Sequence, residues 1–207
     1  MIAIINYGLG NIEAFVNVYK KLHIDVRVAN TPADLVDASK LILPGVGAFD
    51  HAMQSFNNSG MRADVERMVL EDKVPVLGIC VGMQMLANSS AEGSEAGLGW
   101  IGGKILPFAQ TTGAEGLPAP HMGWNDVSPS ANTPLLLGLE NEAKFYFLHS
   151  YFFKCANAGQ SIATSSYGVD FSCAVNSGNV FGVQFHPEKS HHFGVQLLKN
   201  FSDCKSC

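Results

Sequence analysis

Apolar runs alternate with amphipathic stretches over residues 1–90. The aliphatic and β-branched runs predict strands, and the stretches with apolar positions three and four residues apart predict helices between them. Ile12, Phe15, Val16 and Tyr19 would share one face of the first helix. The predicted strands are residues 2–6, 26–28, 41–43 and 74–79, and the predicted helices are residues 11–22, 61–71 and 83–87. Because strands that alternate with helices form parallel sheets, this half of the chain predicts an α/β fold.

The pattern changes from about residue 97, where glycine, proline and short strand-like runs become frequent. Four runs, residues 145–149, 162–166, 172–176 and 180–185, predict hairpins that join or cover the same sheet. A last helix is predicted over residues 191–201. Since no repeat or low-complexity linker divides the chain, we expect a single domain over residues 1–207, with a central, mostly parallel sheet flanked by helices.

The composition excludes several classes of protein. The 207 residues are 47% hydrophobic and 15% charged, which is typical of a compact globular protein. A net charge of -5 without a basic stripe argues against nucleic acid as a principal ligand. The N-terminus has the pattern of a strand and not of a signal peptide, and no apolar run is long enough to span a membrane. Five irregularly spaced cysteines then predict reduced thiols and a cytoplasmic location.

Two short motifs resemble ligand sites but are incomplete. Cys204 and Cys207 form a terminal C-x-x-C, yet no second pair completes a zinc site, so we interpret the segment as a frayed tail and expect no metal. Gly8 and Gly10 follow the first predicted strand, as in dinucleotide-binding loops, but Glu13 stands where the third glycine belongs. We therefore expect no nucleotide and no other cofactor.

A cysteine directly follows the predicted strand at residues 74–79. The sequence Gly78-Ile79-Cys80-Val81-Gly82 places this cysteine between two glycines, at the point where a helix is about to begin. The pattern G-x-C-x-G is typical of a nucleophile elbow, a sharp turn that exposes the reactive atom. The N–H groups at the start of the helix would favour the thiolate of Cys80. A buried structural cysteine is the alternative.

A histidine and a glutamate follow the apolar run at residues 180–185. A catalytic base is expected to be far from its nucleophile in sequence and close to it in the fold, so His186 is the candidate base for Cys80. Glu188 lies two residues later and would hold one tautomer of His186. Taken singly, a core histidine and a solvated acid are the commoner interpretations, but together with Cys80 the two residues predict a catalytic triad.

A glycine-rich loop follows the predicted strand at residues 41–43. The carboxyl ends of strands in an open α/β sheet line the ligand crevice, so we expect this loop beside Cys80. Val46 and Gly47 would supply one backbone N–H of an oxyanion hole, and Val81 would supply the other. A simple tight turn is the alternative.

These motifs resemble the class I, triad-type glutamine amidotransferases, and within them the glutaminase subunits of imidazole glycerol phosphate synthases. The similarity runs essentially from end to end. The segments that carry it are N-Y-G and G-N within residues 6–11, L-P-G-V-G-A-F at 43–49, the elbow at 78–84, P-H-M-G-W-N at 120–125, F-Y-F and H-S-Y within 145–151, and G-V-Q-F-H-P-E-K-S at 182–190. Val81 departs from the family, where leucine is expected, which is a mild change because its backbone N–H is what matters.

The resemblance implies a flavodoxin-like amidotransferase fold and a glutaminase mechanism. Cys80 would attack the side-chain amide of glutamine, His186 would transfer the proton and Glu188 would orient His186, so that a γ-glutamyl thioester forms and is hydrolysed. The residues that would hold the glutamine are Gln84, Glu92, Ser150 and Tyr151. The P-G-V-G loop would rest with its N–H turned away until a partner subunit binds.

The resemblance also implies a heterodimer with the (β/α)₈ cyclase subunit of imidazole glycerol phosphate synthase. That subunit would receive ammonia through an internal tunnel and make imidazole glycerol phosphate and the aminoimidazole carboxamide ribotide. Direct delivery is required because ammonia released into water is protonated. We expect Trp124 and Lys189 at the interface, since tryptophan is a frequent hot-spot residue. Core packing of Trp124 is the alternative.

Three other functions stay open. A paralogous glutaminase would feed ammonia to a protein that makes an amidino-sugar for surface polysaccharide, and the identity of the ammonia acceptor would distinguish it. A free-standing cysteine peptidase or thiol hydrolase is disfavoured by the glutamine-holding residues. A catalytically silent scaffold is disfavoured by the intact triad.

Overall fold

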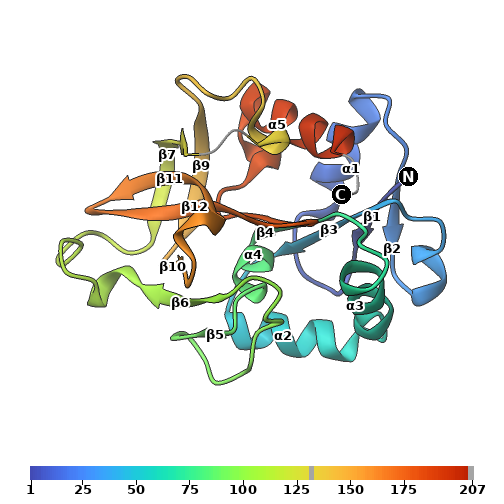
Figure 1. The fold of residues 1–207 in the computed structure, drawn as a ribbon, viewed down its shortest axis with the longest axis horizontal. Coiled ribbons are helices and arrows are strands. Elements are labelled where there is room, and N and C mark those ends of the chain that lie inside the picture. Colours follow the sequence, from blue (N-terminus) through green and yellow to red (C-terminus); the bar gives the residue numbers. More distant parts are fainter. Residues whose placement is uncertain (131–132, 205–207) are drawn as a thin grey trace.

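The computed structural model describes residues 1–130 and 133–204 (Figure 1). Among these residues, eleven strands form one sheet, and β7 and β9 form a second sheet of two strands. The strands of the main sheet follow the order β2-β1-β3-β4-β13-β12-β10-β6-β5, and β11 pairs with both β12 and β8. The expected α/β fold with a mostly parallel central sheet flanked by helices is confirmed.

The parallel part of the sheet is built from the first half of the chain and one late strand. Its strands, in spatial order, are β2 (Val26–Ala29), β1 (Ile2–Ile5), β3 (Lys40–Gly45), β4 (Val76–Cys80) and β13 (Val180–Val183). The helices are α1 (Ile12–Lys21), α2 (Phe49–Asn58), α3 (Arg62–Leu70), α4 (Val81–Met85) and α5 (His191–Asp203). Figure 1 shows α1 and α5 on one side of this part of the sheet and α2 and α3 on the other. Helices on both faces explain why every residue of β1, β4 and β13 is buried.

The remaining strands extend the sheet, and all their pairings are antiparallel except that of β5 with β6. The remaining strands of the main sheet are β5 (Ser89–Ser90), β6 (Gly103–Pro107), β8 (Ser128–Pro129), β10 (Tyr151–Cys155), β11 (Ser161–Tyr167) and β12 (Val169–Ser177). Strand β12 is antiparallel to β13, so it joins the hairpins to the parallel part. The separate pair is β7 (His121–Asp126) and β9 (Lys144–His149), which are antiparallel.

The main differences from the sequence-based predictions are additional elements. Helix α2 was not predicted, although Phe49, Ala52, Met53 and Phe56 have helical spacing and are all fully buried. Strands β6, β7 and β10 were not predicted either. The interpretation of the C-terminus as a frayed tail is wrong for Cys204, because α5 extends to Asp203 and carries this cysteine into the core at 3% exposure. Residues 205–207, which include the other cysteine of that motif, lie outside the described residues.

Within residues 1–130 and 133–204, none of the helices has the length and apolar character that crossing a membrane requires. Cys80, Cys155 and Cys173 form no disulfide in the same part of the chain.

Candidate active site

Cys80 ends β4 and immediately precedes α4, so it forms the predicted strand-to-helix elbow. Its backbone has φ 56° and ψ −113°, a region that residues other than glycine rarely adopt. The two flanking glycines make the turn sterically possible: a Cβ on Gly82 would lie 1.9 Å from the carbonyl oxygen of Leu43, and a Cβ on Gly78 would lie 2.6 Å from the Gly82 oxygen. The elbow is therefore pressed against β3, and any side chain at either glycine would displace it.

His186 and Glu188 lie where β13 ends, next to the end of β4. The two strands are parallel, with Val183 opposite Ile79, so the chain delivers His186 to the same sheet edge as Cys80. His186 Nδ1 lies 3.0 Å from Glu188 Oε1, and the two side chains are 5% and 2% exposed. Because a carboxylate only accepts, Nδ1 carries the proton and Nε2 is left for the sulfur.

Electrostatics favour a protonated imidazole at this position. Burial lowers the pKa of His186, but the interactions with Cys80 and Glu188 outweigh burial and raise the pKa to about 9. His186 therefore holds a proton next to Cys80 at neutral pH, which suits a group that must transfer a proton between the sulfur and a leaving nitrogen.

Two further polar groups contact the sulfur. Cys80 Sγ lies 3.9 Å from the carbonyl oxygen of Leu148, and Gln184 Nε2 lies 3.8 Å from the sulfur. Gln184 also accepts a hydrogen bond of 3.1 Å from Gln84, whose amide nitrogen lies 3.2 Å from the Tyr151 carbonyl oxygen. Gln184 is completely buried. It was not predicted as a site residue, although it stands two positions before His186.

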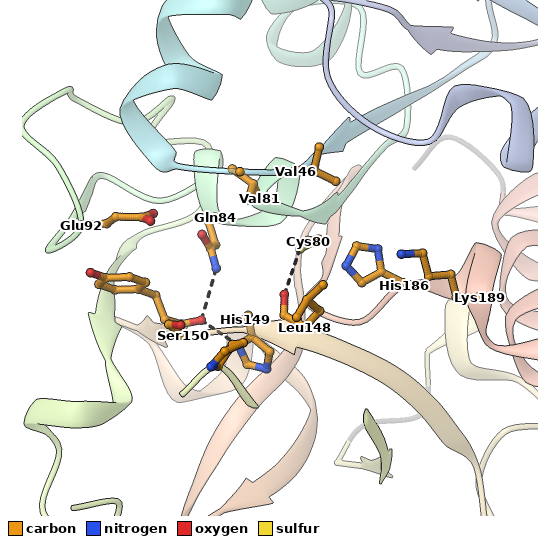
Figure 2. A pocket seen from close by; sticks show the side chains of 13 residues that line it. Val46, Cys80, Val81, Gln84, Glu92, Leu148, His149, Ser150, His186 and Lys189 are labelled. Atoms are coloured by element: carbon orange, nitrogen blue, oxygen red, sulfur yellow. Dashed lines mark hydrogen bonds between the residues drawn. The ribbon is translucent and has the colours of Figure 1, made fainter. Parts of the chain in front are cut away.

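A cavity of about 270 Å³ opens above the sulfur. Most of the predicted site residues line it: Val46, Gly47, Cys80, Val81, Gln84, Glu92, Ser150, Tyr151, His186 and Lys189. Figure 2 shows Glu92 and Lys189 at opposite ends, with Cys80 between Gln84 and His186. Glu188 contacts His186 but does not line the cavity. The structure therefore gathers residues from five separate segments of the sequence around one thiol.

The proposed oxyanion donors belong to the loop after β3 and to the first residue of α4. Gly45 pairs with Cys80 across β3 and β4, which brings the oxyanion loop (residues 45–48) to the cavity. Gly47 has φ +87°, and a Cβ there would meet no atom within 4 Å, so the loop is open at this point. Val81 is the first residue of α4, so its N–H has no acceptor within the helix.

Two buried histidines contact each other beside the cavity, and one of them, His149, lines it. His149 Nδ1 lies 2.8 Å from the Tyr151 carbonyl oxygen, and His149 Nε2 lies 3.0 Å from His121 Nδ1. The carbonyl fixes the tautomers: His149 Nδ1 donates, His149 Nε2 accepts from His121, and His121 Nε2 accepts from the Asn125 amide at 3.1 Å. Burial lowers the pKa of His121 to about 4 and that of His149 to about 3, so both rings are neutral. Neither histidine was predicted as part of the site.

An exposed apolar face adjoins the cavity. Cross-strand pairs of β7 and β9 place Met122 beside Leu148 and Trp124 beside Tyr146, and we call these four residues the β7–β9 face. Met122 is 65% exposed, Trp124 46% and Leu148 37%. The alternative that Trp124 packs in the core is therefore wrong, since its ring stacks on His191 at the surface, with centroids 5.1 Å apart. Lys189 reaches the same region, 5.8 Å from the centre of the Tyr146 ring.

Metal ligands are not clustered in the part of the chain that the structure describes, where no three His, Cys, Asp or Glu side chains are placed to hold an ion. The chemistry that this site can perform rests on a thiol, a histidine that carries a proton and backbone N–H groups. Such a set suits nucleophilic attack on an amide or ester carbonyl.

A family model described as glutamine amidotransferase class-I matches residues 3–203, and the chain belongs to this family. Its sequence is 62% identical over 203 residues to imidazole glycerol phosphate synthase subunit HisH of Bdellovibrio bacteriovorus, covering 98% of this chain and 100% of the relative. It is 48% identical over 202 residues to the protein of the same name in Leptospira interrogans, covering 98% and 99%. These relatives confirm the expected class I amidotransferase and favour the imidazole glycerol phosphate synthase type over the polysaccharide paralogue.

Solved structures agree on the fold. A crystal structure described as a glutamine amidotransferase superposes with a TM-score of 0.76 at 18% identity, covering 98% of this chain and 97% of the other. A glutamine amidotransferase from Thermotoga maritima superposes with a TM-score of 0.62 at 17% identity, covering 98% and 82%.

Proposed function

We propose that this chain is the glutaminase subunit of an imidazole glycerol phosphate synthase, and that it supplies ammonia to a (β/α)₈ cyclase subunit in histidine biosynthesis. The observation that carries the proposal is the arrangement around Cys80. A thiol on a strained elbow shares one cavity with a histidine paired to a buried carboxylate at 3.0 Å, and with the side chains that the family resemblance assigns to glutamine.

The proposed reaction begins with attack of the Cys80 thiolate on the side-chain amide carbon of glutamine, with the thiol proton already held by His186 Nε2. The oxyanion of the tetrahedral intermediate accepts hydrogen bonds from Val81 N–H and from the oxyanion loop. His186 then gives its proton to the leaving nitrogen, the C–N bond breaks and ammonia departs, leaving a γ-glutamyl thioester on Cys80. Water adds to the thioester with His186 as base, the C–S bond breaks, and glutamate leaves while the thiolate of Cys80 and the protonated His186 are restored.

The ends of the cavity suit the two ends of glutamine. Glu92 would pair with the α-ammonium group of glutamine, because it is the carboxylate at the far end from His186 (Figure 2). Gln84, Ser150 and Tyr151 also line the cavity and would hold the substrate backbone. Gln84 is 3% exposed and fixed by two hydrogen bonds, so it presents a preorganised surface to the substrate.

The β7–β9 face is the surface that we assign to the cyclase subunit. Leu148 belongs both to this face and to the cavity lining, so a partner docked there lies next to the point where ammonia is released. An exposed tryptophan and methionine beside a lysine are suited to a protein interface. Trp124 and Lys189 are the proposed anchors. The proposal places the heterodimer in the cytoplasm, consistent with the absence of disulfides at Cys80, Cys155 and Cys173.

The experiment that tests the function compares two cysteine variants in the reconstituted heterodimer. Cys80→Ser should lose glutamine-dependent synthesis by at least about 10³-fold, as expected when a nucleophile that acts in a triad is removed, and keep ammonia-dependent synthesis by the cyclase. Cys155→Ser makes the same chemical change far from the cavity and should keep both activities. Glutamine-dependent turnover that survives in Cys80→Ser would overturn the proposal.

A further inference from the structure

Tyr7 lies directly beneath the strand end that carries the oxyanion loop. Its hydroxyl donates a hydrogen bond of 2.6 Å to the carbonyl oxygen of Pro44, the residue just before that loop. The side chain is 6% exposed, and its ring packs edge-on against Phe56 of α2, with centroids 5.6 Å apart. Tyr7 therefore connects the end of β1 to the base of the loop and to the helix that follows it.

The hydroxyl of Tyr7 is a permanent donor. Burial, and to a smaller extent the neighbouring Cys80, raise the pKa of Tyr7 well above that of an ordinary tyrosine. The phenol therefore stays neutral even when the thiolate forms, and the hydrogen bond to Pro44 persists through the reaction.

The base of the loop is fixed, whereas its middle is free. A Cβ on Gly45 would lie 2.6 Å from the Gly82 nitrogen and 3.0 Å from the Tyr7 hydroxyl, so Gly45 is wedged between the elbow and the tyrosine. Beyond the loop, Phe49 N–H donates to a Glu92 carboxylate oxygen at 3.0 Å, which holds the start of α2. Between these two anchors, Gly47 has open space around its Cα.

We propose that Tyr7 is a positioning residue for the oxyanion hole. Tyr7 holds the Pro44 carbonyl and so confines peptide rotation to Val46 and Gly47. The backbone N–H that this rotation turns toward the substrate then lies at one fixed distance from the Val81 N–H. Without the hydroxyl, the Pro44 carbonyl loses this hydrogen bond, and the donor N–H of the loop spreads over several positions. This inference rests on the proposed function, because it concerns the transition state of glutamine hydrolysis.

The chain offers a matched control for Tyr7→Phe. Tyr19 is also buried, at 0% exposure, and its hydroxyl donates to a backbone carbonyl, that of Leu198, at 3.3 Å, but it belongs to α1, contacts α5 and does not line the cavity. Both variants remove one buried hydroxyl and keep the ring. Any difference between them therefore reports on the position of the hydroxyl and not on the loss of a buried hydrogen bond in general.

The assay is steady-state glutaminase activity of the heterodimer with its cyclase ligand bound. We expect Tyr7→Phe to lower kcat about tenfold with KM unchanged, a fraction of the 10²–10³ that complete loss of one oxyanion donor causes. Tyr19→Phe should keep the wild-type kcat. Alkylation of Cys80 by iodoacetamide does not use the oxyanion hole, so its rate should be the same in Tyr7→Phe and wild type.

Three outcomes would overturn the inference while the wild-type heterodimer is active: an unchanged kcat in Tyr7→Phe, an equal fall in both tyrosine variants, or a parallel loss of Cys80 alkylation. A wild-type heterodimer without glutaminase activity would instead refute the proposed function itself.

Discussion

Replacing Glu188 with glutamine keeps a hydrogen-bond acceptor beside His186 and removes only its charge. At a separation of 3.0 Å and an effective dielectric constant of about 20, the attraction between imidazolium and carboxylate is roughly 5 kcal/mol. The amide oxygen of glutamine would still accept from Nδ1 and recover about 1–2 kcal/mol of this. Hydrolysis of the thioester begins with neutral His186 and forms the imidazolium, so we expect its transition state to lose about 3 kcal/mol, or roughly 10² in rate.

The pH profile gives an independent measure of the same change. His186, with its pKa raised to about 9, keeps its proton up to that pH, so kcat/KM of the wild type should fall as pH rises through about 9. In Glu188→Gln, burial still lowers the pKa of His186 and one of the two opposing groups is gone. The alkaline limb should therefore move to lower pH.

The assay is glutamate release by the heterodimer over a range of pH. Glu142→Gln makes the same substitution at an exposed site and should leave both kcat and the profile unchanged. Wild-type kcat with an unmoved alkaline limb in Glu188→Gln would refute the electrostatic role. A variant as inactive as Cys80→Ser would show that Glu188 does more than orient and charge His186.

Two further predictions concern the partner. The isolated chain should hydrolyse glutamine slowly. The cyclase subunit with its ribotide ligand should accelerate glutamate release by about 10²–10³, the effect of one oxyanion donor. Full-speed hydrolysis by the isolated chain would contradict a latent donor and favour a free-standing hydrolase. Trp124→Ala should raise the Kd for the cyclase at least about 30-fold, as for a hot spot of 2 kcal/mol or more, with little change in Tm. Titration calorimetry would measure this Kd. Val36→Ala, at a residue that is 59% exposed at the other end of the sheet, is the control. A wild-type Kd in Trp124→Ala would exclude Trp124 as an anchor.

The parts of the site that the sequence predicts are those whose residues lie close together along the chain. The elbow is one short segment in which glycines flank Cys80, and the structure shows that these glycines are needed because Leu43 and Gly82 backbone atoms occupy the space of a side chain. His186 and Glu188 are only two residues apart, so their contact is also a local property. Their approach to Cys80 could be anticipated because parallel strands end at one edge of the sheet.

The parts that were not predicted depend on pairing between distant strands. His121 and His149 meet because β7 and β9 are antiparallel in a register that places these two residues opposite each other, 28 positions apart in sequence. Gln184 reaches the sulfur only through the pairing of β13 with β4. Nothing in the local spacing of these residues distinguishes them from ordinary core residues. Helix α2 is different, because the helical spacing of its apolar residues is visible in the sequence itself.

In the proposed mechanism the cavity combines a fixed nucleophile, Cys80, with an adjustable oxyanion hole, and the packing explains this division. The conformation of Cys80, at φ 56°, carries about 1–3 kcal/mol of strain and persists because the elbow is wedged against β3 with no room to relax. A partner subunit therefore has little means of moving the sulfur. The oxyanion loop is the opposite case, because Gly47 adopts a positive φ with open space around it while Tyr7 and Glu92 hold the two ends. In the proposed mechanism, control by the cyclase must then act on stabilisation of the oxyanion and not on the reactivity of Cys80, so partner binding should change kcat far more than the rate at which iodoacetamide alkylates the thiol.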